Sequence, residues 1–330
     1  MNKKYLVPDI RAKDIKQESN RKGFGRALLK LGETSPNVVG LCADLSESTQ
    51  MLAFKEKFPE RFIEVGVAEQ NLVTVGSGLA AMGKIPFVSS YAAFSPGRNW
   101  EQIRTTICLN DRPVKVIGSH AGVSVGPDGA THQMLEDLAI MRALPNMKVF
   151  APCDSVEAEK LTLALAKDPS PNYMRLSRAD SAVFTTEDTP FEIGKAQVFR
   201  EGHDVTIVAT GSLTYHALVA AEILEQDGIH AEVVHVATIK PLDEKTILES
   251  AAKTGAVITA EEGQITGGLG GAVAELLGEH LPTPLKRIGM KDRFGESGEP
   301  NELLEHFGLT GPHIAMAVHE VLEHKKLRAR

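Results

Sequence analysis

The stretch FIEVGVAEQNLVTVGSGLAAMGKIPFV, residues 62–88, carries the pattern that decides the fold. Its two ends, Phe62–Val65 and Ile85–Val88, are short apolar runs that predict strands, and the longer Ala68–Met82 between them predicts an amphipathic helix. The strand runs lack a regular alternation of polar and apolar residues, which is typical of parallel strands with helices on both faces. This stretch therefore predicts part of an open α/β sheet.

The same alternation of strand and helix extends along nearly the whole chain. Further strands are expected at 38–42, 114–117, 149–150, 205–209, 232–236, 257–260 and 285–288, and helices at 20–31, 99–109, 132–142, 155–166, 215–225, 244–252, 271–280 and 312–324. Asp180–Phe191 is polar and contains Pro190, so it predicts a linker. We therefore expect two open α/β domains, a mainly parallel one at 14–180 and a smaller one at 194–325, joined by a linker at 181–193.

The composition excludes several classes of protein. Among the 330 residues, 36 Lys and Arg against 43 Asp and Glu give a formal net charge of −7, so no global basic charge points to nucleic acid or anionic lipid. No apolar run approaches the roughly 18 residues of a membrane span, and the charged residues 1–22 do not resemble a secretory signal. The odd number and wide spacing of Cys42, Cys108 and Cys153 argue against a disulfide framework or a zinc site. We expect a cytoplasmic protein that binds neither nucleic acid nor membrane.

Two predicted strands are followed by unusual residues at their carboxyl ends, where open α/β sheets bind ligands. Glu69 lies at the start of a predicted helix. The favourable interaction of a carboxylate with a helix N-terminus, about 0.3–1 kcal/mol, would explain it, and the alternative is a carboxyl group directed at a ligand. Tyr91 and Phe94 follow the strand at 85–88 and could form a wall for a planar ring, although aromatic residues after a strand more often belong to the core.

Two later segments also contain residues suited to ligand binding. Gly118–Gln133 contains four glycines, a proline and the titratable residues His120, Asp128 and His132. A glycine-rich loop with titratable groups is more typical of a binding site than of packing. The arginines at 175 and 178 follow a short strand, and guanidinium groups suit phosphate or carboxylate ligands, although surface arginines are common.

In their order along the chain, these segments resemble the C-terminal half of transketolase. The resemblance runs from about residue 14 to the end, and its markers are Arg21, ADLSES at 43–48, GVAEQ at 66–70, the Tyr91/Phe94 loop, GPDGATHQ at 126–133, PNM at 145–147, APCD at 151–154 and LSR at 176–178. It implies that the first domain binds the pyrimidine ring of thiamine diphosphate and that the second is a transketolase C-terminal domain. The implied reaction transfers a two-carbon ketol unit from a ketose phosphate to an aldose phosphate, as in the pentose phosphate pathway.

The resemblance also implies roles for residues around the cofactor. Glu69 matches the catalytic glutamate that hydrogen-bonds the aminopyrimidine ring, a role that needs a carboxyl group which stays protonated. Phe94 matches the aromatic residue that stacks on this ring. Tyr91 lies near Phe94, and Asp44 is expected near the cofactor.

A second set of residues matches the family's substrate site. His132 matches the catalytic histidine that contacts the reacting end of the donor sugar. Asp128 matches the residue that contacts a hydroxyl group of the acceptor. Four residues match the shell that binds the sugar phosphate: Arg21, Ser48, His120 and Arg178. Positive groups in such a shell suit a dianionic substrate.

One part of the family's pattern is missing from this sequence. The Gly-Asp-Gly…Asn element that holds the diphosphate and its Mg²⁺ (or Ca²⁺) does not occur, and 330 residues are about half the family's usual length. The resemblance therefore implies a C-terminal subunit that binds no metal itself and works with an N-terminal partner subunit, which supplies the diphosphate and metal ligands. The expected assembly is a heterotetramer in which this chain also self-associates through its two domains.

Two alternatives stay open at this point. The layout is also that of 1-deoxy-D-xylulose-5-phosphate synthase and of the beta subunits of 2-oxo acid dehydrogenases, and Thr131-His132-Gln133 is shared with the synthase. The other alternative is a non-catalytic homologue that only dimerises. The presence of Glu69, Phe94 and His132 favours an enzyme.

Overall fold

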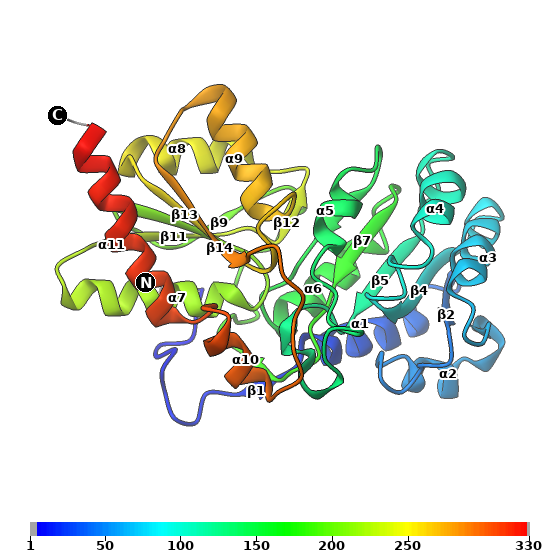
Figure 1. The fold of residues 1–330 in the computed structure, drawn as a ribbon. Coiled ribbons are helices and arrows are strands. Elements are labelled where there is room, and N and C mark those ends of the chain that lie inside the picture. The colour runs from blue at the N-terminus through cyan, green and yellow to red at the C-terminus, as the bar shows by residue number, and fades with distance from the viewer. Residues whose placement is uncertain (1–4, 329–330) are drawn as a thin grey trace.

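The computed structural model describes residues 5–328. They form two large β-sheets, each covered by helices, that lie side by side (Figure 1). The first sheet has seven strands in the order β12-β6-β7-β5-β4-β2-β3. All neighbours in it are parallel except β12, which runs antiparallel to β6. The strands are β2 (Val38–Cys42), β3 (Phe62–Glu64), β4 (Ile85–Tyr91), β5 (Lys115–Ser119), β6 (Lys148–Phe150), β7 (Asn172–Arg175) and β12 (Thr238–Lys240).

Helices cover both faces of the first sheet. On one face, α1 (Asn20–Thr34) buries Phe24, Ala27, Leu28 and Leu31, whose spacing places them on one side of the helix. They pack with α2 (Leu52–Lys57) and α6 (Ser155–Leu165) against the strands. The other face is covered by α3 (Glu69–Ala81), α5 (Asp137–Arg142) and the helical turns at 100–108, of which α4 is Trp100–Gln102. The structure confirms the predicted mainly parallel sheet with helices on both faces.

The second sheet has five strands in the order β14-β13-β10-β11-β9. Its parallel strands are β10 (Val205–Ala209), β11 (Ala231–His235), β13 (Val257–Gln264) and β14 (Leu285–Met290), and β9 (Gln197–Arg200) runs antiparallel at one edge. One face packs against α7 (Leu213–Gln226) and α11 (Gly311–Arg328). The other face packs against α8 (Glu244–Thr254) and α9 (Leu269–His280). In residues 5–328 no helix is long and apolar enough to cross a membrane.

The structure differs from the sequence expectations in its smaller elements. The helix expected at 132–142 begins only at Asp137, because residues 129–135 form turns held by other parts of the chain. Several short elements were not expected from the sequence, namely α2, α10 (Pro300–His306), β9 and the short pair β1 (Gln17–Glu18) and β8 (Ser181–Ala182). The strand β12, which crosses from the second half of the chain to the edge of the first sheet, was also not expected. The domain limits 14–180 and 194–325 stay predictions.

Candidate active site

The residues selected from the sequence lie beyond the carboxyl ends of neighbouring strands in the first sheet. β4 ends at Tyr91, β5 ends one residue before His120, and β7 ends three residues before Arg178. β2 and β3 lead into the segments that contain Asp44 and Glu69. Because these strands are parallel neighbours, their loops meet at one edge of the sheet, where α/β proteins place their ligands.

Four rings, from the end of β4 and from the segments that follow β4 and β5, form an aromatic cluster at this edge. The Tyr91 ring stacks on His120, with centroids 3.8 Å apart and planes at 25°. Phe94 lies 6.1 Å from Tyr91, and the His132 ring meets Phe94 edge-on at 5.3 Å and 74°. The structure thus brings together residues that the sequence separates by more than 40 positions. Such packed rings form a wall that fits a planar ligand.

Arg21 joins this cluster from the first turn of α1. Its Nη1 donates to the carbonyl oxygen of Ser48 and lies 3.5 Å from Nε2 of His120. Its Nη2 donates to the carbonyl oxygen of Arg178 at 2.9 Å. The Arg178 guanidinium in turn donates to the carbonyl oxygen of Val125 at 2.8 Å. Two guanidinium groups are therefore held beside His120 by backbone carbonyl oxygens.

His120 is neutral in this surrounding. Burial, and then the nearby charges of Arg21, Arg178 and His132, lower the pKa of His120 to about 2. Its Nδ1 lies 2.8 Å from the hydroxyl oxygen of Ser119. Its Nε2 faces the Arg21 guanidinium, which can only donate, so Nε2 carries the lone pair and Nδ1 carries the proton. The ring can therefore accept a hydrogen bond on its Arg21 side.

Glu69 is the first residue of α3 and only 4% exposed. Its backbone carbonyl accepts a hydrogen bond from Asn99 Nδ2 at 2.8 Å. Its carboxylate oxygens lie 3.3 and 3.5 Å from Nη1 of Arg98, whose guanidinium also lies 4.2 Å from the centroid of the Phe94 ring. Arg98 was not singled out from the sequence. The feature of the sequence that could have identified Arg98 is its position four residues after Phe94, just beyond the Pro96-Gly97 turn.

His132 and Asp128 lie on the glycine-rich loop, and the structure holds only one of them in the cluster. His132 Nδ1 lies 2.9 Å from the hydroxyl oxygen of Thr131, in addition to its contact with Phe94. Asp128 is exposed, and its backbone carbonyl accepts from Thr131 at 3.5 Å. The Asp128 carboxylate is thus available to a ligand from solvent.

Asp44 is placed by a glutamate that sequence reasoning missed. Asp44 is exposed, with a positive φ of 58°, and is the second residue after β2. Oε1 of Glu64 accepts from the backbone N–H of Asp44 at 2.7 Å and from that of Gly66 at 3.0 Å. Glu64 therefore ties the Asp44 turn to the segment that leads into Glu69.

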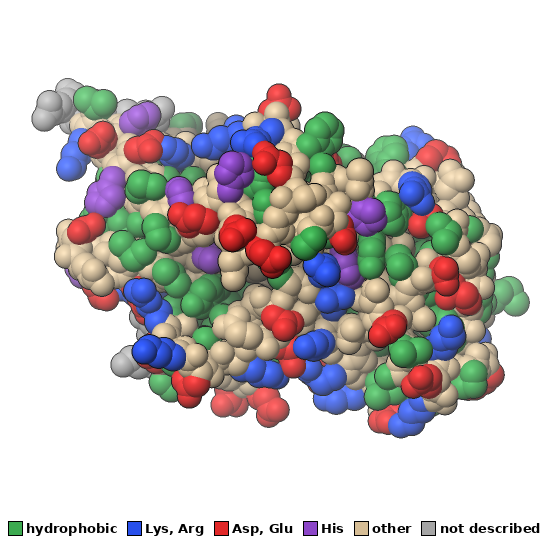
Figure 2. All heavy atoms as spheres, turned by 60° about the horizontal axis from the view of Figure 1, so that its bottom comes forward, with side chains coloured by type: hydrophobic (Ala, Val, Ile, Leu, Met, Phe, Trp, Pro, Cys, Tyr) green, Lys and Arg blue, Asp and Glu red, His purple; other side chains and the backbone are tan. Residues whose placement is uncertain are grey.

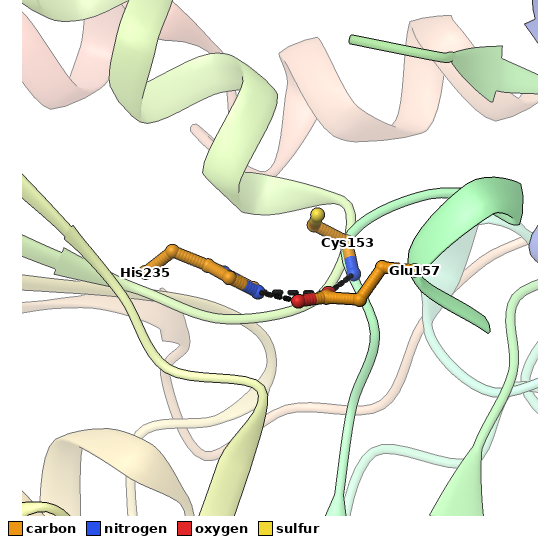
Figure 3. A group of neighbouring side chains, drawn as sticks. All are labelled: Cys153, Glu157 and His235. Atoms are coloured by element: carbon orange, nitrogen blue, oxygen red, sulfur yellow. Dashed lines mark hydrogen bonds and ion pairs between the residues drawn. The ribbon is translucent and has the colours of Figure 1, made fainter. Parts of the chain in front are cut away.

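A buried trio at the junction of the two domains contains metal-binding residue types (Figure 3). The potential ligand atoms of Cys153, Glu157 and His235 lie within 4.8 Å of one another. His235 Nε2 lies 2.8 and 3.0 Å from the two Glu157 oxygens, and one of these also accepts from the Cys153 N–H at 2.7 Å. Burial raises the pKa of the Cys153 thiol, which opposes the thiolate that metals bind. These groups bond one another and link the domains.

Charged side chains of both signs are interspersed on the face drawn in Figure 2. Histidine side chains lie beside Lys and Arg side chains near the middle of this face. No broad area of a single sign is visible on it, in keeping with the modest formal net charge of −7.

The two halves of the chain match two known family models. The family model "transketolase, pyrimidine binding domain" matches residues 16–182, and "transketolase, C-terminal domain" matches residues 194–314. The 6-deoxy-6-sulfo-D-fructose transketolase subunit SqwH of Clostridium sp. is 44% identical over 91% of this chain and 94% of its own length. A solved structure described as a split-gene transketolase, an inactive β4 tetramer, is 47% identical, with a TM-score of 0.87 over 92% of this chain and 98% of that chain.

A longer relative matches along the same residues. The 1-deoxy-D-xylulose-5-phosphate synthase of Synechococcus sp. is 38% identical over 95% of this chain, but the match spans only 49% of the synthase. The chain is therefore similar to half of that enzyme and to nearly the full length of the subunit and the split-gene protein.

Proposed function

Because the chain belongs to the transketolase family, we propose that it is the C-terminal subunit of a split transketolase. With an N-terminal partner subunit and thiamine diphosphate, it transfers a two-carbon ketol unit from a ketose phosphate to an aldose phosphate. The observation that carries this proposal is the convergence of rings and guanidinium groups at one sheet edge, from Arg21, Tyr91, Phe94, His120 and Arg178. Near full-length similarity to transketolase subunits supports it.

Glu69 and Phe94 fit the aminopyrimidine half of the cofactor. The Glu69 carboxyl group is almost fully buried, and the face of the Phe94 ring accepts a flat cationic group at 4.2 Å. When bound, thiamine diphosphate supplies the nucleophilic carbon that takes up the ketol unit. Glu69 would hold a proton between its carboxylate oxygen and a ring nitrogen, after Arg98 has moved away from that oxygen. We place Tyr91 and Asp44 beside the same ring.

The substrate side is formed by the residues around His120. Two guanidinium groups, held by carbonyl oxygens, leave N–H donors for the phosphate of a sugar, and charge-assisted bonds of this kind are strong. The neutral His120 ring adds an uncharged partner, and Ser48 lies against Arg21. We assign His132 to the reacting end of the donor and the exposed Asp128 to a hydroxyl group of the acceptor.

A partner subunit completes the site in this proposal. The chain lacks the Gly-Asp-Gly…Asn element, so the diphosphate and its Mg²⁺ are held by ligands of the N-terminal subunit. We propose a heterotetramer of two such pairs, in which this chain self-associates. The description of the similar solved structure as an inactive β4 tetramer fits a subunit that needs a partner, although those words apply to that protein.

The test is reconstitution of the complex. The purified chain is mixed with the N-terminal subunit, thiamine diphosphate and Mg²⁺, and ketol transfer is assayed from xylulose 5-phosphate to ribose 5-phosphate. Because the Clostridium relative is named for 6-deoxy-6-sulfo-D-fructose, that sugar is a second donor to assay. We expect turnover only in the mixture. Turnover no higher than that of either subunit alone, with every donor, would contradict the proposal.

One assay separates this proposal from the synthase alternative. Pyruvate and glyceraldehyde 3-phosphate are supplied to the same complex, and release of carbon dioxide is measured. We expect none, because the chain is 44% identical to a transketolase subunit along nearly all of that subunit's length and 38% identical to the synthase. Decarboxylation of pyruvate would favour the synthase reading.

A further inference from the structure

The side chain of Gln133 joins the loop at 122–132, here called the substrate-side loop, to the second domain. Its Nε2 donates to the carbonyl oxygens of Val123 at 3.1 Å and Gly126 at 3.2 Å, both in the loop. The same nitrogen donates to the carbonyl oxygen of Glu296 in the second domain at 2.8 Å. Gln133 is only 4% exposed, so these bonds form away from water. The two N–H donors of this buried amide, one of them shared, thus connect two loop carbonyls with one carbonyl of the second domain.

Glu262 of β13 holds the other end of the substrate-side loop. Its Oε1 accepts from the backbone N–H of Ser124 at 2.7 Å, and its Oε2 accepts from the Ser212 hydroxyl at 3.0 Å. The side chain of Val123 is fully buried within the apolar core of the second domain, together with Leu303 of α10. The loop is therefore attached to the second domain by polar and apolar contacts.

The backbone of the second domain also approaches this loop very closely. The approaching stretch, here called the clamp segment, is Asp292–Pro300. A Cβ on Gly295 would lie 1.8 Å from Oε1 of Gln133, and a Cβ on Gly129 would lie 2.4 Å from the Ser297 hydroxyl. A side chain at Gly295 would force the Gln133 amide to shift, and one at Gly129 would displace the Ser297 hydroxyl and strain a backbone whose φ is 69°.

We propose that the second domain is a working part of the substrate site, in which the clamp segment and Glu262 fix the substrate-side loop and Gln133 is the positioning residue. A loop rich in glycine loses much conformational entropy when it is ordered, so an external support lowers the cost of binding substrate. The proposal rests on the proposed function for the role of His132 and Asp128, which this loop presents. The physical coupling between clamp and loop does not depend on it.

The coupling is tested by hydrogen–deuterium exchange on the full isolated chain. Gln133→Met keeps the side-chain size but removes the amide donor, and Gly295→Ala disturbs the same amide from the second domain. We expect either change to accelerate exchange in the substrate-side loop and the clamp segment about ten-fold, as expected for losing a buried hydrogen bond. Exchange in α3 should not change. Gln197→Met, at a partly exposed amide elsewhere in the second domain, and Gly278→Ala, where a Cβ meets nothing within 4 Å, are the matched controls.

The reconstituted complex provides the second readout. We expect Gln133→Met and Gly295→Ala to raise KM for the sugar phosphates about ten-fold while the half-saturating concentration of thiamine diphosphate changes less than two-fold. Unchanged loop exchange in both variants would overturn the proposal, as would equal changes in α3 and the loop. If the wild-type complex shows no ketol transfer, the proposed function fails, and the exchange measurements still decide the coupling.

Discussion

Arg98 lies over the two groups, the Glu69 carboxylate and the Phe94 ring, that we assign to the aminopyrimidine of the cofactor. The Arg98 side chain is 52% exposed and the Glu69 side chain 4%, and the cation–π contact of Arg98 with Phe94 adds about 0.5–1 kcal/mol to this ion pair. Arg98→Met removes this competition, so the complex should bind thiamine diphosphate about three- to ten-fold more tightly. Titration of activity with the cofactor measures the change. Weaker binding would mean that Arg98 itself holds the cofactor.

Glu69 is the proton-holding residue of the proposed site. Glu69→Gln keeps the size of the side chain and its place at the start of α3, but it removes the acid. We expect kcat of the reconstituted complex to fall by about 10²–10⁴, the usual contribution of a positioned acid or base. The exposed Glu101→Gln, in neighbouring α4, is the control and should keep wild-type kcat. A Glu69→Gln rate within a few-fold of wild type would support the non-catalytic alternative.

His120 predicts a pH dependence of stability. Burial and the charges of Arg21, Arg178 and His132 lower its pKa to about 2, below the unfolded value of about 6.5. The unfolded chain therefore takes up a proton below pH 6.5 that the folded chain refuses, and the free energy of unfolding falls as the pH is lowered. Between pH 7.5 and 5.5 the loss from this group is about 1.4 kcal/mol.

His120→Gln removes that contribution and keeps a polar side chain. Urea unfolding of the isolated chain at the two pH values should show a loss smaller than that of wild type by about this amount. The exposed His203→Gln should behave as wild type. An identical pH dependence in His120→Gln would show that the folded state protonates this ring as readily as the unfolded one.

At the scale of elements, α1 positions Arg21 through its N-terminal cap. The Ser19 hydroxyl accepts from the backbone N–H of Arg21 at 3.3 Å and from its Nε at 3.1 Å. Ser19→Ala should lower the free energy of unfolding by about 1 kcal/mol, and it should also raise KM for the sugar phosphate, because Arg21 loses a support. Ser35→Ala, at the other end of the same helix, should do neither. A loss of stability without any change in KM would show that the Ser19 cap does not position Arg21 for the substrate.

The elements that were predictable are those with a strong local pattern. The strand–helix–strand unit at 62–88 and the side of α1 that is buried against the sheet both follow from the spacing of apolar residues alone. The start of α5 at Asp137 was not predictable, because Gln133 and its neighbours are held by a segment some 160 positions away. For the same reason Arg98 and Glu64 were missed in the site, since their roles depend on which loops the sheet brings together.

At the scale of the whole molecule, the two domains are joined by more than a linker. β12 crosses to the first sheet, the Glu157–His235 pair is buried at the junction, and the clamp segment supports the substrate-side loop. In our account the molecule provides an acid, a ring wall and a phosphate shell at one edge of the first sheet. In our account it lacks ligands for the diphosphate and Mg²⁺, which come from the partner subunit.

The most direct test of this account is calorimetric titration of the isolated chain and of the reconstituted complex with thiamine diphosphate, with and without Mg²⁺. We predict Mg²⁺-dependent binding in the complex and none in the isolated chain at the same concentrations. Tight, Mg²⁺-dependent binding by the isolated chain, accompanied by ketol transfer, would contradict the account.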